Sequence, residues 1–192
     1  RVDRRQRQMC IRDRPYPAQE GEQLKVLVNR AKENNVIFYW AIHPGQDIRW
    51  NEEDRSLLLQ KFESMYQLGV RGFAVFFDDI SGEGTKADKQ AELLNYIDDH
   101  FVKVKRDVAP LILCPTEYNK SWTDVEGGYL TTLGDKLNEG IKVMWTGDMV
   151  VATIDKSTLD FVNPLLKRKA YIWWNFPVSD YVQDHLLLGP VY

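Results

Sequence analysis

The sequence has little cysteine, no long apolar run and no strong excess of either charge. Its two cysteines, Cys10 and Cys114, lie in unlike contexts, so we expect neither a disulfide nor a metal site built on them. No apolar stretch reaches the roughly 18 residues that a membrane-spanning helix needs, and we recognise no signal peptide. The formal net charge of −3 gives no general attraction to nucleic acid or to anionic membranes. We therefore expect neither kind of partner.

Positive charge is concentrated in residues 1–14. Six arginines stand there against Asp3 and Asp13, which gives a local charge of +4 and leaves −7 for the rest of the chain. The segment shows neither helical nor strand periodicity. A basic arm that binds nucleic acid is one interpretation. We favour the other, in which residues 1–14 are a disordered or non-native leader outside the folded domain.

From Pro15 onwards, short apolar bursts alternate with amphipathic stretches. Each burst is nearly continuous in apolar or β-branched residues, as in parallel strands that are covered on both faces. Their centres recur about every 30 to 38 residues, the size of one βα unit. The expected strands are Ile37–Ile42, Phe73–Phe77, Leu111–Cys114, Val143–Trp145 and Ala170–Trp174.

Apolar residues between the strands recur at helical spacing. Strict alternation of strand and helix is typical of an α/β barrel or of a doubly wound sheet. The four helices that these spacings predict are marked by Leu24, Leu27, Val28 and Ala31, by Leu58, Phe62 and Met65, by Leu94, Ile97, Phe101 and Val104, and by Leu159, Val162, Leu165 and Leu166.

Polar groups follow every expected strand. Barrel enzymes build their sites from the ends of many strands, whereas a doubly wound sheet concentrates its site at one switch point. No segment matches a glycine-rich phosphate loop closely enough to count, and we expect no cofactor. We therefore expect an α/β fold of the (β/α)8 TIM-barrel type. The polar segments are His43–Gly45, Asp78–Asp79, Pro115–Tyr118, Thr146–Asp148 and Asn175–Asp180.

Asp78 and Asp79 are the first candidates for catalysis. They close the apolar run Phe73–Phe77, where two carboxylates are costly to bury unless they are paired or hydrogen-bonded. Their proximity should drive their pKa values apart and leave one as an acid and one as an anion. Adjacent residues do not easily flank a sugar as the two carboxyls of a carboxylate-nucleophile glycosidase do. They would more readily act side by side, one as proton donor and one orienting a nucleophile that the substrate supplies. The alternative is that one aspartate caps the next helix and the other is solvated.

Other polar and aromatic side chains at strand ends suit a sugar. Strand alternation turns only one of Trp173 and Trp174 inwards. Asn175 and Asp180 offer donors and acceptors for hydroxyl groups, with loop capping as the alternative, and Tyr118 either binds a ligand or packs. The histidines add less. His43 is the tempting general base, but we expect it to be structural, and the three histidines show no metal-ligand spacing, so we expect no metal.

Four motifs stand in one order along the chain: Phe76–Ile80, Cys114–Asn119, Met144–Asp148 and Trp173–Tyr181. Together they resemble glycoside hydrolase family 84, which contains bacterial O-GlcNAcase-like β-N-acetylglucosaminidases and animal O-GlcNAcase. The likeness runs from about Pro15 to Tyr192 and is especially close to the Bacteroides-type enzymes. It implies a retaining removal of terminal N-acetylglucosamine through an oxazoline intermediate, with a glycoprotein or glycoside as substrate.

The resemblance also implies roles for particular residues. Asp78 would orient and polarise the acetamido N–H, and Asp79 would be the general acid and then the general base. Tyr118, Thr146 and Trp173 would hold or enclose the acetamido group. Asn175 would contact the reacting region and Asp180 the distal hydroxyls. Cys114 and Val150 would line the acetamido pocket or the aglycone side. These sugar-binding residues are Tyr118, Thr146, Trp173, Asn175, Asp180, Cys114 and Val150.

The resemblance finally implies an incomplete barrel. In the family, two strands precede the segment near Val36, so residues 15–192 would form a partial catalytic domain with about strands three to eight. An open barrel would expose the pairing edge of Ile37–Ile42, which predicts self-association. An inactive fragment that binds N-acetylglucosamine weakly is the alternative to an enzyme. The likeness to bacterial enzymes implies a periplasmic or secreted parent protein.

Overall fold

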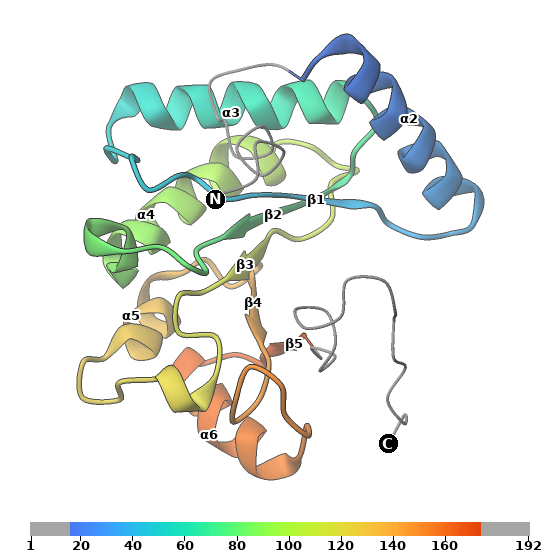
Figure 1. Cartoon of the computed structure of the whole chain (residues 1–192). Coiled ribbons are helices and arrows are strands. Elements are labelled where there is room, and N and C mark those ends of the chain that lie inside the picture. Colours follow the sequence, from blue (N-terminus) through green and yellow to red (C-terminus); the bar gives the residue numbers. More distant parts are fainter. Residues whose placement is uncertain (1–15, 174–192) are drawn as a thin grey trace, which may run out of the picture.

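The computed structural model describes residues 16–173 and contains a parallel five-stranded sheet (Figure 1). The strand order is β1-β2-β3-β4-β5, so each strand lies beside the next one along the chain. A doubly wound sheet reverses its order at a switch point, and the described strands show no reversal. The order is therefore that of a barrel wall. The strands are β1 (Tyr39–Ile42), β2 (Gly72–Phe76), β3 (Ile112–Cys114), β4 (Lys142–Trp145) and β5 (Tyr171–Ile172).

Helices precede β1 and connect the strands. The side chain of Asn51 caps the helix before β2 by accepting a hydrogen bond from the Asp54 amide at 2.9 Å, and Asp155 caps the last helix through the Thr158 amide at 3.0 Å. Each cap is worth about 1 kcal/mol. The described helices are α2 (Ala18–Glu33), α3 (Glu52–Gln67), α4 (Ala87–Ile97), α5 (Tyr129–Lys136) and α6 (Lys156–Leu166), with the shorter turns η1 (Gly82–Thr85), η2 (Asp98–Val102) and η3 (Lys120–Trp122).

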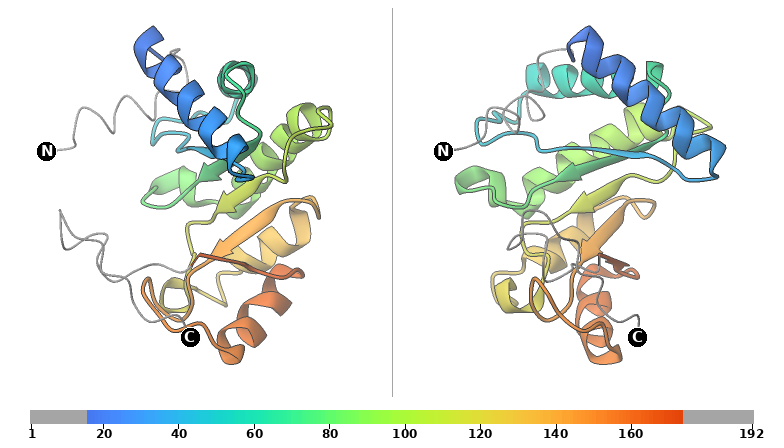
Figure 2. Two further views of the ribbon diagram at one scale, coloured as in Figure 1. Left: turned by 90° about the vertical axis from the view of Figure 1, so that its right-hand side faces the viewer. Right: turned by 45° about the vertical axis from the view of Figure 1, so that its right-hand side comes forward.

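The two faces of the sheet have different neighbours. Phe73 and Val75 of β2 belong to a large core that the strands share with the helices. Ala74 and Phe76 alternate with them and belong to a smaller cluster that contains no residue of an α-helix. Figure 2 shows the helices on the outer side of the strands. The helix-free face corresponds to the interior of a barrel, which is where barrel enzymes open their sites at one end.

An aromatic cluster anchors β2 to the helix layer. The Phe73 ring is fully buried, and its centroid lies 5.1 Å from that of Phe62 in α3 and 5.0 Å from that of Phe101 in η2. Trp40 of β1 adds an edge contact at 6.3 Å. Such pairs contribute about 0.5–1.5 kcal/mol each beyond their buried area. The cluster therefore holds the strand that leads directly to Asp78 and Asp79.

The strand predictions are confirmed, because each expected burst overlaps one of the five strands, although β2 and β4 each begin one residue earlier than expected. The helix marked by Leu58, Phe62 and Met65 is also confirmed, and all three side chains are buried. The apolar spacings of the sequence predict no helix over Tyr129–Lys136, which forms α5. That helix has only eight residues, so its apolar pattern is short.

Two predicted core positions are wrong. Val104 is 69% exposed, because α4 ends at Ile97 and continues as the π-helical turn η2. One wider turn shifts the helical phase, and Val102 is buried instead. Leu27 is 54% exposed on the outer side of α2, whereas the next residue, Val28, faces the core.

Several expectations stay predictions. The leader 1–14 lies outside the described residues, as does any strand near residue 190. Within the described sheet β1 has β2 as its one strand neighbour, and self-association through the other edge of β1 is untested. The eight-strand count and the missing βα units are likewise untested. Between residues 16 and 173, no helix is long and apolar enough to cross a membrane.

Candidate active site

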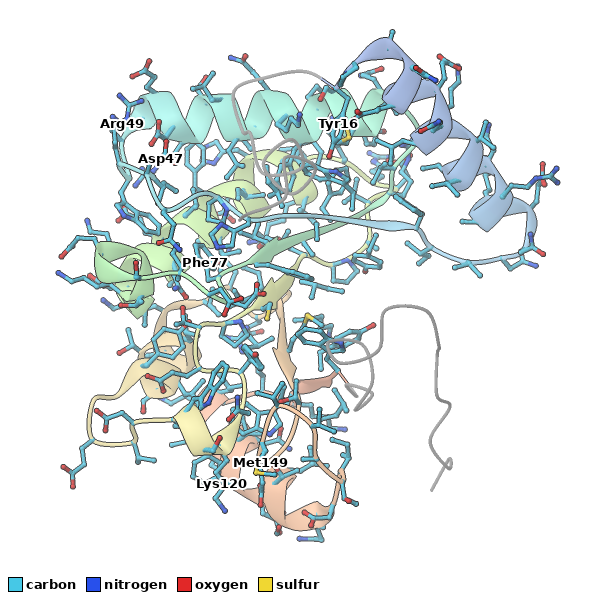
Figure 3. The ribbon with its side chains drawn as sticks, in the orientation of Figure 1. Tyr16, Asp47, Arg49, Phe77, Lys120 and Met149 are labelled. Carbon is cyan, nitrogen blue, oxygen red and sulfur yellow. The ribbon has the colours of Figure 1, made fainter. Side chains whose placement is uncertain are left out.

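The polar segments that follow β1, β2, β3 and β4 lie at one end of the sheet, because the strands run parallel. In Figure 3, Asp47 and Arg49 from the segment after β1 lie at the same end as Phe77, which follows β2. The loops after β3 and β4 are joined by backbone hydrogen bonds, among them Lys120 N to Gly147 O at 3.0 Å. This carboxyl end of the sheet is where a barrel enzyme carries its site.

Four of the predicted sugar-binding residues lie in, or pack against, the cluster on the helix-free face. Cys114 ends β3, Tyr118 follows it in the next loop, and both are buried there. Trp173 packs against them: its ring stacks on Phe76 at a centroid distance of 6.4 Å and is tilted against Tyr118 at 6.0 Å. Val150 also packs against this cluster. Residues from four separate segments of the chain are thus brought together.

Asp78 is a partly buried carboxyl directly after β2. Burial raises its pKa above the usual 3.8, and the neighbouring charge of Asp79 acts in the same direction. A hydrogen bond from its own backbone and the charge of His43 oppose this rise. Removal from water disfavours the ionised form, so Asp78 is a stronger base than an exposed aspartate.

Asp79 differs from Asp78 in exposure and backbone conformation. It is exposed, and its φ of 52° lies in the left-handed region. A non-glycine residue in that region costs about 1 kcal/mol and is held there only by its surroundings. The chain turns sharply at Asp79, so the two adjacent carboxyls have different environments, one partly shielded and one open to solvent.

Cys114 is fully buried at the end of β3. Burial raises the pKa of its thiol, and the charges of Asp78 and Asp79 raise it further. Thiol reactivity depends on the thiolate, so Cys114 is no nucleophile at neutral pH. It fits the expectation that it lines the site.

Thr146 is fully buried and holds backbone. Its hydroxyl is bonded to the carbonyl of Met149 at 2.9 Å, and its amide donates to the carbonyl of Tyr118 at 2.9 Å. Thr146 therefore fixes the loop that carries Tyr118, which is consistent with shaping a pocket. Its contact with a sugar is untested.

The remaining predicted residues, Asn175 and Asp180, lie outside the described residues. The same holds for Trp174, the residue expected to alternate inwards and outwards with Trp173. Among residues 16–173 no group of three or more histidine, cysteine, aspartate or glutamate side chains is arranged to hold a metal ion.

Three side chains that the sequence analysis did not place in the site contact the turn that bears Asp78 and Asp79. Each donates to one of three consecutive backbone carbonyls, and two of the three come from the loop between β1 and α3. The contacts are Thr116 Oγ1 to Phe77 O at 3.0 Å, His43 Nε2 to Asp78 O at 3.1 Å and Gln46 Nε2 to Asp79 O at 2.6 Å. The expectation that His43 is structural agrees with its contact.

A protein-family model described as beta-N-acetylglucosaminidase matches residues 5–192. The chain belongs to this family. The match begins inside the segment 1–14 that the sequence analysis set apart, and the boundary at residue 14 stays a prediction.

Curated proteins and solved structures resemble the chain in sequence and fold. Protein O-GlcNAcase from Rattus norvegicus and from Mus musculus are each 36% identical over 185 residues, which is 91% of this chain and 20% of either relative. The solved structure of CpGH84B is 39% identical with a TM-score of 0.86, covering 94% of this chain and 33% of that one. That of CpGH84D is 32% identical with a TM-score of 0.78 over 88% of this chain and 29% of that one.

These matches confirm the resemblance to glycoside hydrolase family 84. They also show that the chain spans about a fifth to a third of the length of its relatives. The family is one of glycosidases, and the β-N-acetylglucosaminidase fold brings Asp78, Cys114, Tyr118 and Trp173 to one end of the sheet.

Proposed function

We propose that the chain carries the catalytic centre of a retaining β-N-acetylglucosaminidase that removes terminal N-acetylglucosamine from glycoproteins or glycosides. The observation that carries the proposal is the pair Asp78 and Asp79 after β2, with unlike exposure, at the end of the sheet where Tyr118 and Trp173 pack together. Family membership supports the same substrate class.

The proposed first step uses the substrate as its own nucleophile. The acetamido oxygen attacks the anomeric carbon while the glycosidic C–O bond breaks, and Asp79 in its acid form gives its proton to the leaving oxygen. Asp78 accepts the hydrogen of the acetamido N–H, which makes the acetamido oxygen more electron-rich. The raised pKa of Asp78 suits this role, because a stronger base holds that hydrogen more tightly. The product of the step is a neutral oxazoline.

The proposed second step reverses the proton movements. Asp79, now a carboxylate, removes a proton from water as the water attacks the anomeric carbon. The bond from that carbon to the acetamido oxygen breaks, and Asp78 returns the hydrogen to nitrogen. Exposure of Asp79 supports this assignment, because the acid and base must meet both the departing group and the incoming water.

Further residues are proposed to position the sugar. Tyr118 and Trp173 would hold and enclose the acetamido group, with Cys114, Thr146 and Val150 shaping the same pocket. Asn175 would contact the reacting region and Asp180 the distal hydroxyls. A periplasmic or secreted location of the parent protein remains a proposal from the family likeness alone.

Proton NMR of an aryl β-N-acetylglucosaminide during hydrolysis tests the proposal. The first sugar to accumulate is expected to be the β anomer, because two successive inversions retain the configuration. Early appearance of the α anomer would contradict the oxazoline route. If circular dichroism shows that the chain is folded and it still gives no turnover, the alternative is favoured, a family member that binds N-acetylglucosamine without cleaving its glycosides.

A further inference from the structure

We propose that His43, Gln46 and Thr116 are positioning residues, a carbonyl clamp that holds the turn after β2 so that its two carboxyls keep one geometry. His43 and Gln46 reach the turn from the loop after β1, and Thr116 reaches it from the loop after β3. The turn is therefore held from both strands that flank β2. The catalytic role of the clamp rests on the proposed function, whereas its mechanical role does not.

The hydrogen bonds of His43 define the direction of its contact. The Gly45 amide is 3.0 Å from Nδ1 and can only donate, so Nδ1 accepts. The neutral ring then carries its hydrogen on Nε2, which faces the Asp78 carbonyl, a pure acceptor, at 3.1 Å. Both ring nitrogens are thereby occupied, so His43 acts on the turn and has no free lone pair for proton transfer.

Gln46 and Thr116 are fixed in the same way by their second contacts. The Gln46 oxygen accepts from both the amide and the hydroxyl of Ser81 at 3.0 Å, which turns its NH₂ group towards Asp79. The Thr116 hydroxyl accepts from the fully buried Gln90 at 2.8 Å and so directs its own hydrogen to Phe77. Each member of the clamp is thus held by the protein on one side and holds the turn with the other.

The clamp binds backbone carbonyls, and none of its three hydrogen bonds uses the carboxyl group of Asp78 or Asp79. This matters at Asp79, whose left-handed backbone is maintained by its surroundings. Small displacements of a reacting group cost rate, because a poorly aligned group spends less time in attack geometry. Loss of one clamp contact is therefore expected to reduce turnover without removing any group that touches the sugar.

Two matched pairs of variants separate the clamp from ordinary folding effects. In His43→Asn the shorter side chain still accepts from the Gly45 amide in an Asx-type turn but falls short of Asp78, whereas His43→Gln places an amide nitrogen near the position of Nε2. Thr116→Val keeps the shape and removes the hydroxyl, and Thr116→Ser keeps the hydroxyl. We expect kcat to fall by about 10- to 100-fold in His43→Asn and Thr116→Val, with KM within about twofold. The Gln and Ser variants should retain most of the activity.

A second readout needs no turnover. Carboxyl-carbon NMR should show the Asp78 titration midpoint move towards that of an exposed aspartate in His43→Asn, because a released turn is better hydrated, and stay near wild type in His43→Gln. Both variants replace the imidazole by an uncharged amide, so the electrostatic effect of the ring on Asp78 is removed equally from both, and the other charged neighbour, Asp79, is unchanged. Equal titrations and equal rates within each pair would overturn the clamp. A folded wild type without turnover would reject the proposed function, and the titrations alone would then decide the clamp.

Discussion

Replacing Asp79 by alanine is expected to lower the turnover of an aryl β-N-acetylglucosaminide by about 10²- to 10⁴-fold, the range that a general acid and base contributes. The loss should be largest for aryl groups that leave poorly, because these depend most on proton donation. Steady-state kinetics over a series of phenols of graded acidity measures this. Since Asp79 is exposed, the variant should still fold, with only a small fall in melting temperature because alanine tolerates the left-handed backbone less well than aspartate.

Azide provides the control for Asp79→Ala. With a phenol that leaves well, azide should restore turnover in the variant and give a β-glycosyl azide, because a small anion needs no base to activate it. It should leave wild type little changed. A variant that retains full activity with poor leaving groups would remove Asp79 from the acid and base role. Loss of activity without azide rescue would contradict its role as a base.

Replacing Asp78 by asparagine is expected to lower turnover by about 10²- to 10³-fold, the cost of removing one electrostatic contact to the developing charge. Asparagine keeps the shape of the side chain but cannot accept the acetamido hydrogen as a base. The same substitution should stabilise the fold at neutral pH, because it removes a charge that is costly to bury. Activity and stability should thus change in opposite directions.

The pH dependence of the stability difference identifies its cause. The pKa of Asp78 is raised in the folded state, so the cost of its charge is full above that raised pKa. The cost shrinks as pH falls through the raised pKa and vanishes below the usual value of 3.8, where the folded and unfolded states are both protonated. Thermal melts of both proteins between neutral pH and pH 3 should therefore converge.

Asp155→Ala is the matched control for these melts. Hydrogen bonds from Ser157 and the Thr158 amide lower the pKa of Asp155, so its carboxylate stabilises the fold above its usual pKa and loses this effect as pH falls. The control should therefore be less stable than wild type at neutral pH and should approach it in acid. An Asp78→Asn protein with the same trend as the control would show that Asp78 is not desolvated.

The sequence predicts the sheet better than the helices that cover it. Strand bursts such as Phe73–Phe77 are nearly continuous in apolar residues because parallel strands are covered on both faces. Such a run identifies a strand without any need to decide which of its positions face the core. Helical positions depend on phase. The π-helical turn η2 changes the phase after Ile97, and for this reason Val104 is exposed where regular spacing predicts a buried side chain.

The candidate site divides in the same way. Asp78 and Asp79 could be found because they follow a strand, and parallel strands deliver whatever follows them to a common end. The clamp could not be found, since a hydrogen bond to a backbone carbonyl leaves no mark on the acceptor residue. Which loop folds over the turn is decided by the packing of β1 and β3 on β2. The sequence offers one signal for the clamp, a polar residue soon after each strand that flanks β2. These residues are His43 after β1 and Thr116 after β3.

The central claim is that the acetamido oxygen of the substrate is the nucleophile, with Asp78 and Asp79 assisting it. Its most direct test compares the turnover by wild type of two aryl glycosides, one with an N-acetyl and one with an N-trifluoroacetyl group. Fluorine withdraws electrons from the amide oxygen and makes it a weaker nucleophile. The account therefore predicts a steep fall in kcat/KM for the fluorinated substrate, although the two substrates bind with similar affinity. Equal rates for the two substrates would contradict it, because a nucleophile supplied by the protein would be indifferent to the substituent.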